Sequence, residues 1–159
     1  CRKKISEESL FCEHCGHKLK ESVVEKNKYV KQVIEHLKFL GYESKQTEKE
    51  EYLEINASHP SKYRITVSCG KIGFTVVSFF TLNAEKVKKS REKFLEMINS
   101  MNNKATLVSY SVNLDGNVLV CGSWYPNNYN KETFGQFIDL FGSDIQARLI
   151  EYEYLADFA

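Results

Sequence analysis

Residues 63–80 read YRITVSCGKIGFTVVSFF, and the rest of the chain can be arranged around them. Two runs of β-branched and aromatic residues flank the segment 69–71, which is typical of a strand, a tight turn and a returning strand. In the first run apolar and polar residues alternate, which predicts one buried and one wetter face. The run 74–80 is apolar almost throughout, which predicts cover on both faces. We therefore expect a central hairpin of a sheet here.

Other segments carry the periodicity of helices and strands. Apolar residues at three- and four-residue spacing predict helices over three segments, 23–40, 83–103 and 130–152. The charged run 42–57 alternates in its second half and predicts a strand near an edge of the sheet. The segment 105–126 predicts a second hairpin, because its Asp-Gly pair at 115–116 suits a tight turn.

Residues that favour helix ends mark the boundaries of these helices. Ser22 opens a capping box before the first helix, and Gly41 follows it as a left-handed terminator. Asn83 and Asn130 have side chains that cap helix N-termini. The pair at 142–143, Gly-Ser, predicts a break in the last helical region.

The predicted element order is α-β-β-β-α-β-β-α, which indicates an α+β fold class. We expect an antiparallel five-stranded sheet with its helices mainly on one face, preceded by a small zinc ribbon. A chain of 159 residues with a formal net charge of +1 suffices for one domain and a short appendage. Its apolar runs are far shorter than the roughly 20 residues that cross a bilayer. We expect no membrane association and a cytoplasmic protein.

Cysteine spacing predicts a metal site near the N-terminus. Cys12 and Cys15 form a C-x-x-C-G turn, in which two thiolates converge on one ion. Ten residues separate Cys1 from Cys12, and Cys1 supplies a third thiolate. His14 and His17 are alternative ligands, and three free thiols in a tail are the simplest non-metal interpretation. A disulfide between the paired cysteines is less favoured, because such closely spaced pairs more often hold metal.

The run CRKKISEESLFCEHCGHKL at 1–19 resembles the short bacterial zinc-ribbon module of form C-x-x-C-x(10)-F-C-x-x-C-G-x-x-L. The resemblance implies a structural Zn²⁺ held by Cys1, Cys12, Cys15 and a cysteine three positions before Cys1. It also implies that residues 1–21 are a zinc-ribbon remnant separate from a domain over 22–159.

The element order, together with YSVNLDGNVLVCGSWYP and NKETFGQFIDLF, resembles the YbjN family. That resemblance implies the fold of the type III secretion chaperones over roughly residues 23–155. Members of the family are described as regulators of sensory signalling, and the related chaperones bind partner proteins as dimers without catalysis. The resemblance therefore implies a fold and a non-catalytic style of function.

The aromatic residues predict a surface for a protein or peptide partner. A sheet with helices on one face leaves the other face to be covered, and four residues are our candidates for that contact: Phe79, Trp124, Tyr125 and Tyr129. A homodimer would cover them, and burial in a single core is the alternative. The favoured function is a protein-interaction or regulatory module that binds a partner polypeptide on the sheet face or a strand edge.

Two other functional classes are weaker. Nucleic-acid binding would use basic residues of the ribbon, namely Arg2, Lys3, Lys4, Lys18 and Lys20. The near-neutral overall charge and the ribbon's own glutamates argue against it. An enzyme would need convergent titratable groups, but His36 is expected on an exposed helix face and His59 in a turn. Cys69 and Cys121 lie in strand contexts and are expected to be buried free thiols. We therefore predict no catalytic residues.

Overall fold

The computed structural model describes Cys15 and residues 23–48, 53–70, 73–126 and 129–159. Its helices are α1 (Val23–Phe39), α2 (Ala84–Lys89), α3 (Arg91–Lys104), α4 (Lys131–Glu151) and a terminal 3-10 helix, η1 (Glu153–Phe158). Its strands are β1 (Glu43–Glu48), β2 (Leu53–Ser58), β3 (Ile65–Cys69), β4 (Gly73–Thr81), β5 (Ser109–Val112) and β6 (Val118–Pro126).

The strands form one antiparallel sheet in the order β1-β2-β3-β4-β6-β5. The hairpin of β3 and β4 lies at its centre, as residues 63–80 predict. The sheet has six strands, so the predicted five-stranded sheet is wrong. The segment 42–57, which predicts one strand, contains β1 and all of β2 except Ser58, and these two strands pair with each other. Only the second strand has apolar alternation, because β1 lies on an edge and has mostly exposed side chains.

The caps predicted at Gly41, Asn83 and Asn130 are confirmed, whereas Ser22 lies outside the described residues; the helices differ from the prediction in two places. Gly41 has a φ of +90° just after α1, and the side chain of Asn83 accepts a hydrogen bond from the Lys86 amide. The second helix is divided at Ser90 into α2 and α3. The predicted break at 142–143 is absent, and α4 continues through these residues. The Ser143 hydroxyl donates a hydrogen bond to the Asp139 carbonyl one turn earlier in the helix.

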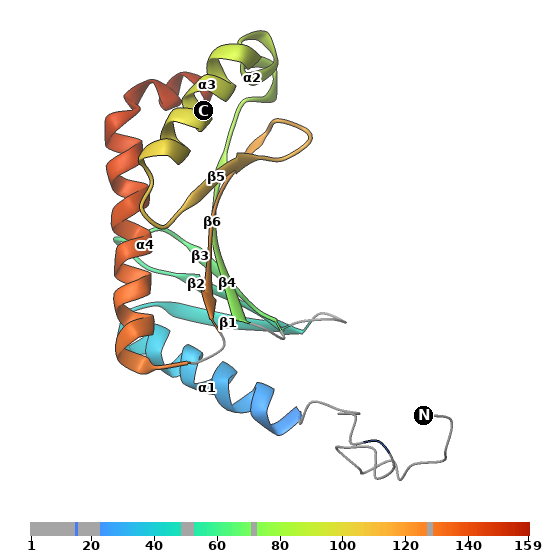
Figure 1. The fold of residues 1–159 in the computed structure, drawn as a ribbon, viewed down its shortest axis with the longest axis vertical. Coiled ribbons are helices and arrows are strands. Elements are labelled where there is room, and N and C mark those ends of the chain that lie inside the picture. The colour runs from blue at the N-terminus through green and yellow to red at the C-terminus, as the bar shows by residue number, and fades with distance from the viewer. Residues whose placement is uncertain (1–14, 16–22, 49–52, 71–72, 127–128) are drawn as a thin grey trace.

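The helices gather on one side of the sheet, with α4 running along the sheet face (Figure 1). Buried strand residues point toward this helical layer, among them Ile55, Val67, Phe74, Val76, Leu119 and Cys121. They meet an aromatic cluster that α4 contributes, centred on Phe134 and Phe141. The prediction that 74–80 is covered on both faces is wrong, because β4 buries alternate residues and exposes Phe79.

Candidate protein-interaction surface

The strand register assigns one residue in two to the face of the sheet opposite the helices. Along β4 these outward residues are Gly73, Thr75, Val77, Phe79 and Thr81, and their partners on β6 are Pro126, Trp124, Gly122, Val120 and Val118. No helix covers this face in the part of the chain that the structure describes (Figure 1). The outward residues of two neighbouring central strands are therefore available at the surface.

Apolar side chains are concentrated on the outward face of β4 and β6. Phe79 is 57% exposed and Trp124 is 52% exposed, while three half-buried valines lie among them. We call these five residues the apolar strip: Val77, Phe79, Val118, Val120 and Trp124. Large exposed aromatic residues that share one uncovered sheet face with other apolar side chains are typical of an interaction surface.

Trp124 is positioned by a neighbouring glycine. A Cβ atom built on Gly73 would lie 2.6 Å from Nε1 of Trp124, so the indole lies directly over the glycine backbone. Any larger residue at 73 would displace the ring. The glycine thus lets the indole approach the backbone of β4, while about half of the Trp124 side chain stays exposed.

The half of the outward face that β1, β2 and β3 form is polar. Thr66 donates a hydrogen bond to Oδ1 of Asn56 at 2.9 Å, and Nδ2 of Asn56 donates to Oε1 of Glu54 at 2.9 Å. These side chains on β2 and β3 satisfy one another. The outward face therefore has a polar half over β1–β3 and an apolar half over β4 and β6.

The structure separates the four aromatic residues predicted from the sequence. Phe79 and Trp124 lie together in the apolar strip. Tyr125 is 6% exposed and points to the helical side, where its hydroxyl lies 2.6 Å from that of Thr133. Tyr129 is half-buried between α1 and α4, with its hydroxyl 3.1 Å from Nδ1 of His36. The three valines of the strip were missed, although their period-two spacing from Phe79 and Trp124 was a usable signal.

The β5 edge of the sheet, next to the apolar half, is closed by a side chain. The Tyr110 amide donates to Oδ1 of Asn102 at 2.7 Å, and Nδ2 of Asn102 donates to the Tyr110 carbonyl at 2.8 Å. The carboxamide thus occupies both backbone groups that Tyr110 would offer to an added strand. Asn102 comes from α3, so the helix and the edge strand are fixed together.

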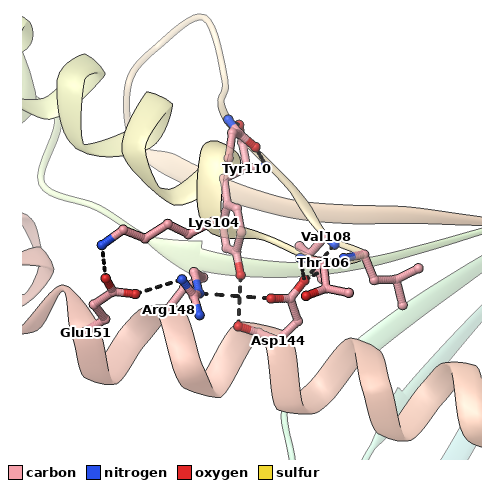
Figure 2. Close-up of polar contacts among 9 residues, drawn as sticks. Lys104, Thr106, Val108, Tyr110, Asp144, Arg148 and Glu151 are labelled. Atoms are coloured by element: carbon pink, nitrogen blue, oxygen red, sulfur yellow. Dashed lines mark hydrogen bonds and ion pairs between the residues drawn. The ribbon is translucent and has the colours of Figure 1, made fainter.

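A buried carboxylate holds the loop that leads into β5. Figure 2 shows Asp144 pointing from α4 toward this loop. Its Oδ2 accepts hydrogen bonds from the amides of Thr106, Leu107 and Val108 at 3.0, 2.8 and 2.9 Å. Three amide donors on one oxygen satisfy the otherwise unpaired backbone of this loop. We interpret Asp144 as a structural anchor for β5.

The residues around Asp144 complete a polar network (Figure 2). Arg148 donates from Nη1 to Oε2 of Glu151 at 2.7 Å, and Lys104 also contacts Glu151. Nε of Arg148 lies 4.0 Å from Oδ1 of Asp144, too far for a hydrogen bond, so this contact is electrostatic. The network ties α3, α4 and the loop together.

Among the described residues, His36, His59, Cys69 and Cys121 do not form a reactive cluster. His36 is 5% exposed, so its predicted exposure is wrong: α4 packs over it through Phe134 and Gly135. His59 lies in the turn after β2 and packs on Tyr42, which agrees with its prediction as a turn residue. Burial raises the pKa of both Cys69 and Cys121 to about 12, so these thiols stay protonated at neutral pH.

The predicted zinc ligands fall mostly outside the described residues. Cys1 and Cys12 are not among them, and Cys15 is an exposed free thiol. The described part of the chain contains no group of three or more His, Cys, Asp or Glu residues arranged to hold a metal ion. The zinc-ribbon interpretation stays a prediction from cysteine spacing.

These observations define an antiparallel α+β domain with its helices on one sheet face and an apolar strip on the other. The structure of YbjN from E. coli, a proposed transcription regulator, is similar to this fold with a TM-score of 0.58. The match covers 78% of this chain and 90% of that chain at 12% sequence identity, so it supports a shared fold. No protein-family model and no curated protein sequence matches the chain. None of the described helices is long and apolar enough to cross a membrane.

Proposed function

We propose that the α+β domain is a non-catalytic interaction module that binds a segment of a partner polypeptide on the open face of its sheet. The apolar strip carries this proposal, because it combines Phe79 and Trp124 with three valines on one sheet face that no described helix covers. The similar fold of YbjN, which is described as a proposed transcription regulator, is compatible with a regulatory role for this chain.

The proposed binding energy comes from apolar contacts and not from charge. Transfer of exposed aromatic side chains from water into a contact stabilises a complex by an amount that grows with the buried apolar area. Contacts of this type survive added salt, whereas binding to phosphate groups weakens steeply with salt. Salt dependence therefore separates protein binding on the sheet from nucleic-acid binding by the ribbon.

The test is retention of a partner from extracts of the source cell by the whole chain, at low and high salt. Phe79→Ala is expected to weaken binding by more than about 1 kcal/mol, while the protein keeps its thermal stability, because the ring is mostly exposed. Trp124→Ala is less clean, because it also uncovers Gly73. Loss of retention in Lys3→Ala/Lys4→Ala with no effect of Phe79→Ala would instead favour the ribbon as the functional surface.

We also propose that Cys1, Cys12 and Cys15 contribute to a structural Zn²⁺ site in the N-terminal ribbon. Three thiolates at this spacing suit Zn²⁺, which is commonly tetrahedral in structural sites. Metal analysis of the full-length protein, with the cysteine expected before Cys1 and purified without chelators, is expected to give one zinc per chain, and Cys12→Ser is expected to lower it. A zinc content near zero in the unmodified protein would contradict the proposal.

A further inference from the structure

We propose that the partner segment binds in an extended conformation along the free edge of β6, adding a short strand beside Trp124. The proposal rests on the function proposed above only in taking the occupant to be a polypeptide. The sheet narrows at this edge, because β5 pairs with β6 no further than Ser109 with Gly122. From Ser123 to Pro126, β6 pairs with β4 alone and is the outermost strand of the sheet.

The hydrogen-bonding pattern of the sheet directs the backbone of Trp124 toward this free edge. In an antiparallel sheet each residue points its N–H and C=O to one side, and successive residues alternate between the two sides. Tyr110 points away from β6, since its amide and carbonyl are bonded to Asn102. Its neighbour Ser109 therefore points toward β6 and meets Gly122. Two residues further along β6, Trp124 points the same way, past the start of β5.

The pairing with β4 gives the same direction independently. The Gly73 carbonyl accepts a hydrogen bond from the Gly70 amide, so Gly73 points toward the β3 side and Phe74 toward β6. Phe74 pairs with Tyr125, which therefore points toward β4 and leaves Trp124 pointing to the free edge. Within the described residues, no backbone group outside the strands bonds to the amide or carbonyl of Trp124. Both groups are available to an added strand.

The chain's own residues before β5 are held away from this edge. If β5 continued in the same register, Leu107 would lie opposite Trp124. Instead the amides of residues 106–108 bond to Asp144 on α4 (Figure 2). The Ser123 hydroxyl donates to the Leu107 carbonyl at 3.0 Å, from the helical side of β6. These contacts draw the loop to the helical layer and leave the place opposite Trp124 clear of it.

A similar gap beside β4 is adjoined by the chain itself. Residues 78–81 have no strand partner on the β3 side. There the Ser78 hydroxyl donates to the Arg64 carbonyl at 2.7 Å, and the rings of Tyr63 and Phe80 lie 5.5 Å apart between centroids. The edge of β6 is therefore the better place for an added strand.

The residues at the edge limit what the added strand can be. Pro126 points the same way as Trp124 but has no N–H, so the edge offers two carbonyls and one amide. An antiparallel strand would use two of its own amides, two residues apart, to reach these carbonyls. Its residue opposite Trp124 would share the outward face with the indole, where an aromatic or β-branched side chain packs best.

Amide exchange at Trp124 tests the site directly. Short peptides without tryptophan, selected from a display library against the full chain, serve as probes. The Trp124 amide is expected to exchange rapidly in the free chain and at least about tenfold more slowly with peptide bound, as followed by NMR. The Tyr110 amide is the control, because it is already bonded to Asn102 and should keep its rate.

Methylation of single backbone nitrogens in the best peptide tests the pairing. Affinity is expected to fall at least about tenfold at two positions that are two residues apart, and to be kept when the amide between them is methylated. The two prolines of the chain provide matched variants. Pro126→Ala adds an amide at the edge and should tighten binding several-fold, whereas Pro60→Ala, in the exposed turn after β2, should not. Equal responses of the two variants would contradict the edge.

Other outcomes overturn the edge or the function separately. If binders depend on Phe79 but neither protect the Trp124 amide nor respond to methylation in alternation, the edge is wrong and the open face stands as the interaction surface. If binders neither protect Trp124 nor depend on Phe79, both proposals fail. If the Trp124 amide is already protected in the free chain, the edge is occupied by this chain or by a second copy, and the proposal is wrong.

Discussion

At the scale of single residues, the carboxylate of Asp144 connects α4 to the loop before β5. Asp144→Ala leaves three amides without their acceptor and Arg148 without its nearby charge. We expect a loss of about 3 kcal/mol in the free energy of unfolding, measured with urea. Asp139→Ala on the same helix is the control, because its ion pair with Lys62 is exposed and is expected to contribute less than about 1 kcal/mol. Equal losses in the two variants would contradict the anchoring role.

His36 is expected to make stability depend on pH. Burial, and next the charge of Lys131, lower its pKa below the ordinary value of 6.5, while Asp139 acts in the opposite direction. The unfolded chain therefore binds the proton more tightly than the folded chain. The free energy of unfolding should fall as pH drops through and below about 6.5, by at most about 1.4 kcal/mol per pH unit. Urea unfolding of His36→Gln should show a shallower dependence over this range, and an unchanged slope would refute the assignment.

At the scale of elements, the β5 edge depends on one side chain from α3. Asn102→Ala removes both hydrogen bonds to Tyr110 and exposes an unpaired strand edge. We expect a loss of roughly 1–2 kcal/mol and greater self-association on warming, followed by thermal unfolding with light scattering. The neighbouring exposed residue offers the control Asn103→Ala, which should behave like the unmodified protein.

The two glycines within α4 should respond differently to alanine. Gly142→Ala adds a methyl group in open space and should stabilise the protein by about 0.5–1 kcal/mol, since glycine is a poor helix former. Gly135→Ala would place its Cβ atom 3.1 Å from the ring of His36, so its gain should be smaller or negative. Thermal unfolding of both variants measures the difference in stability. Equal gains would show that His36 on α1 moves readily to make room for the methyl group at 135.

At the scale of the whole molecule, the α+β domain should be stable without metal. Its core is formed by residues between Val30 and Phe158, all outside the ribbon. Removal of zinc with a chelator is therefore expected to leave the thermal unfolding of the domain unchanged. An unfolding transition that belongs to the ribbon would be lost. A large fall in Tm after chelation would mean that the ribbon packs on the domain and supports it.

Features with local signals could be predicted from the residues alone. The central hairpin of β3 and β4 follows from residue types over fewer than twenty positions, and the caps at Asn83 and Asn130 act on amides three residues away. The left-handed φ of Gly41 is also a local signal, whereas the close approach of the His59 ring to Gly41 comes from the tertiary structure.

Only the tertiary structure decided which side chains are covered. Asp144 bonds to amides 36 to 38 positions away, and His36 meets Tyr129 at a separation of 93. Period-two patterns in β4 and β6 cannot say which face receives the helices, so Tyr125 and Trp124 looked equivalent although one is buried and the other exposed. The additional strand, β1, was not predicted either. As an edge strand it has little apolar alternation, and its pairing with β2 is seen only in the tertiary structure.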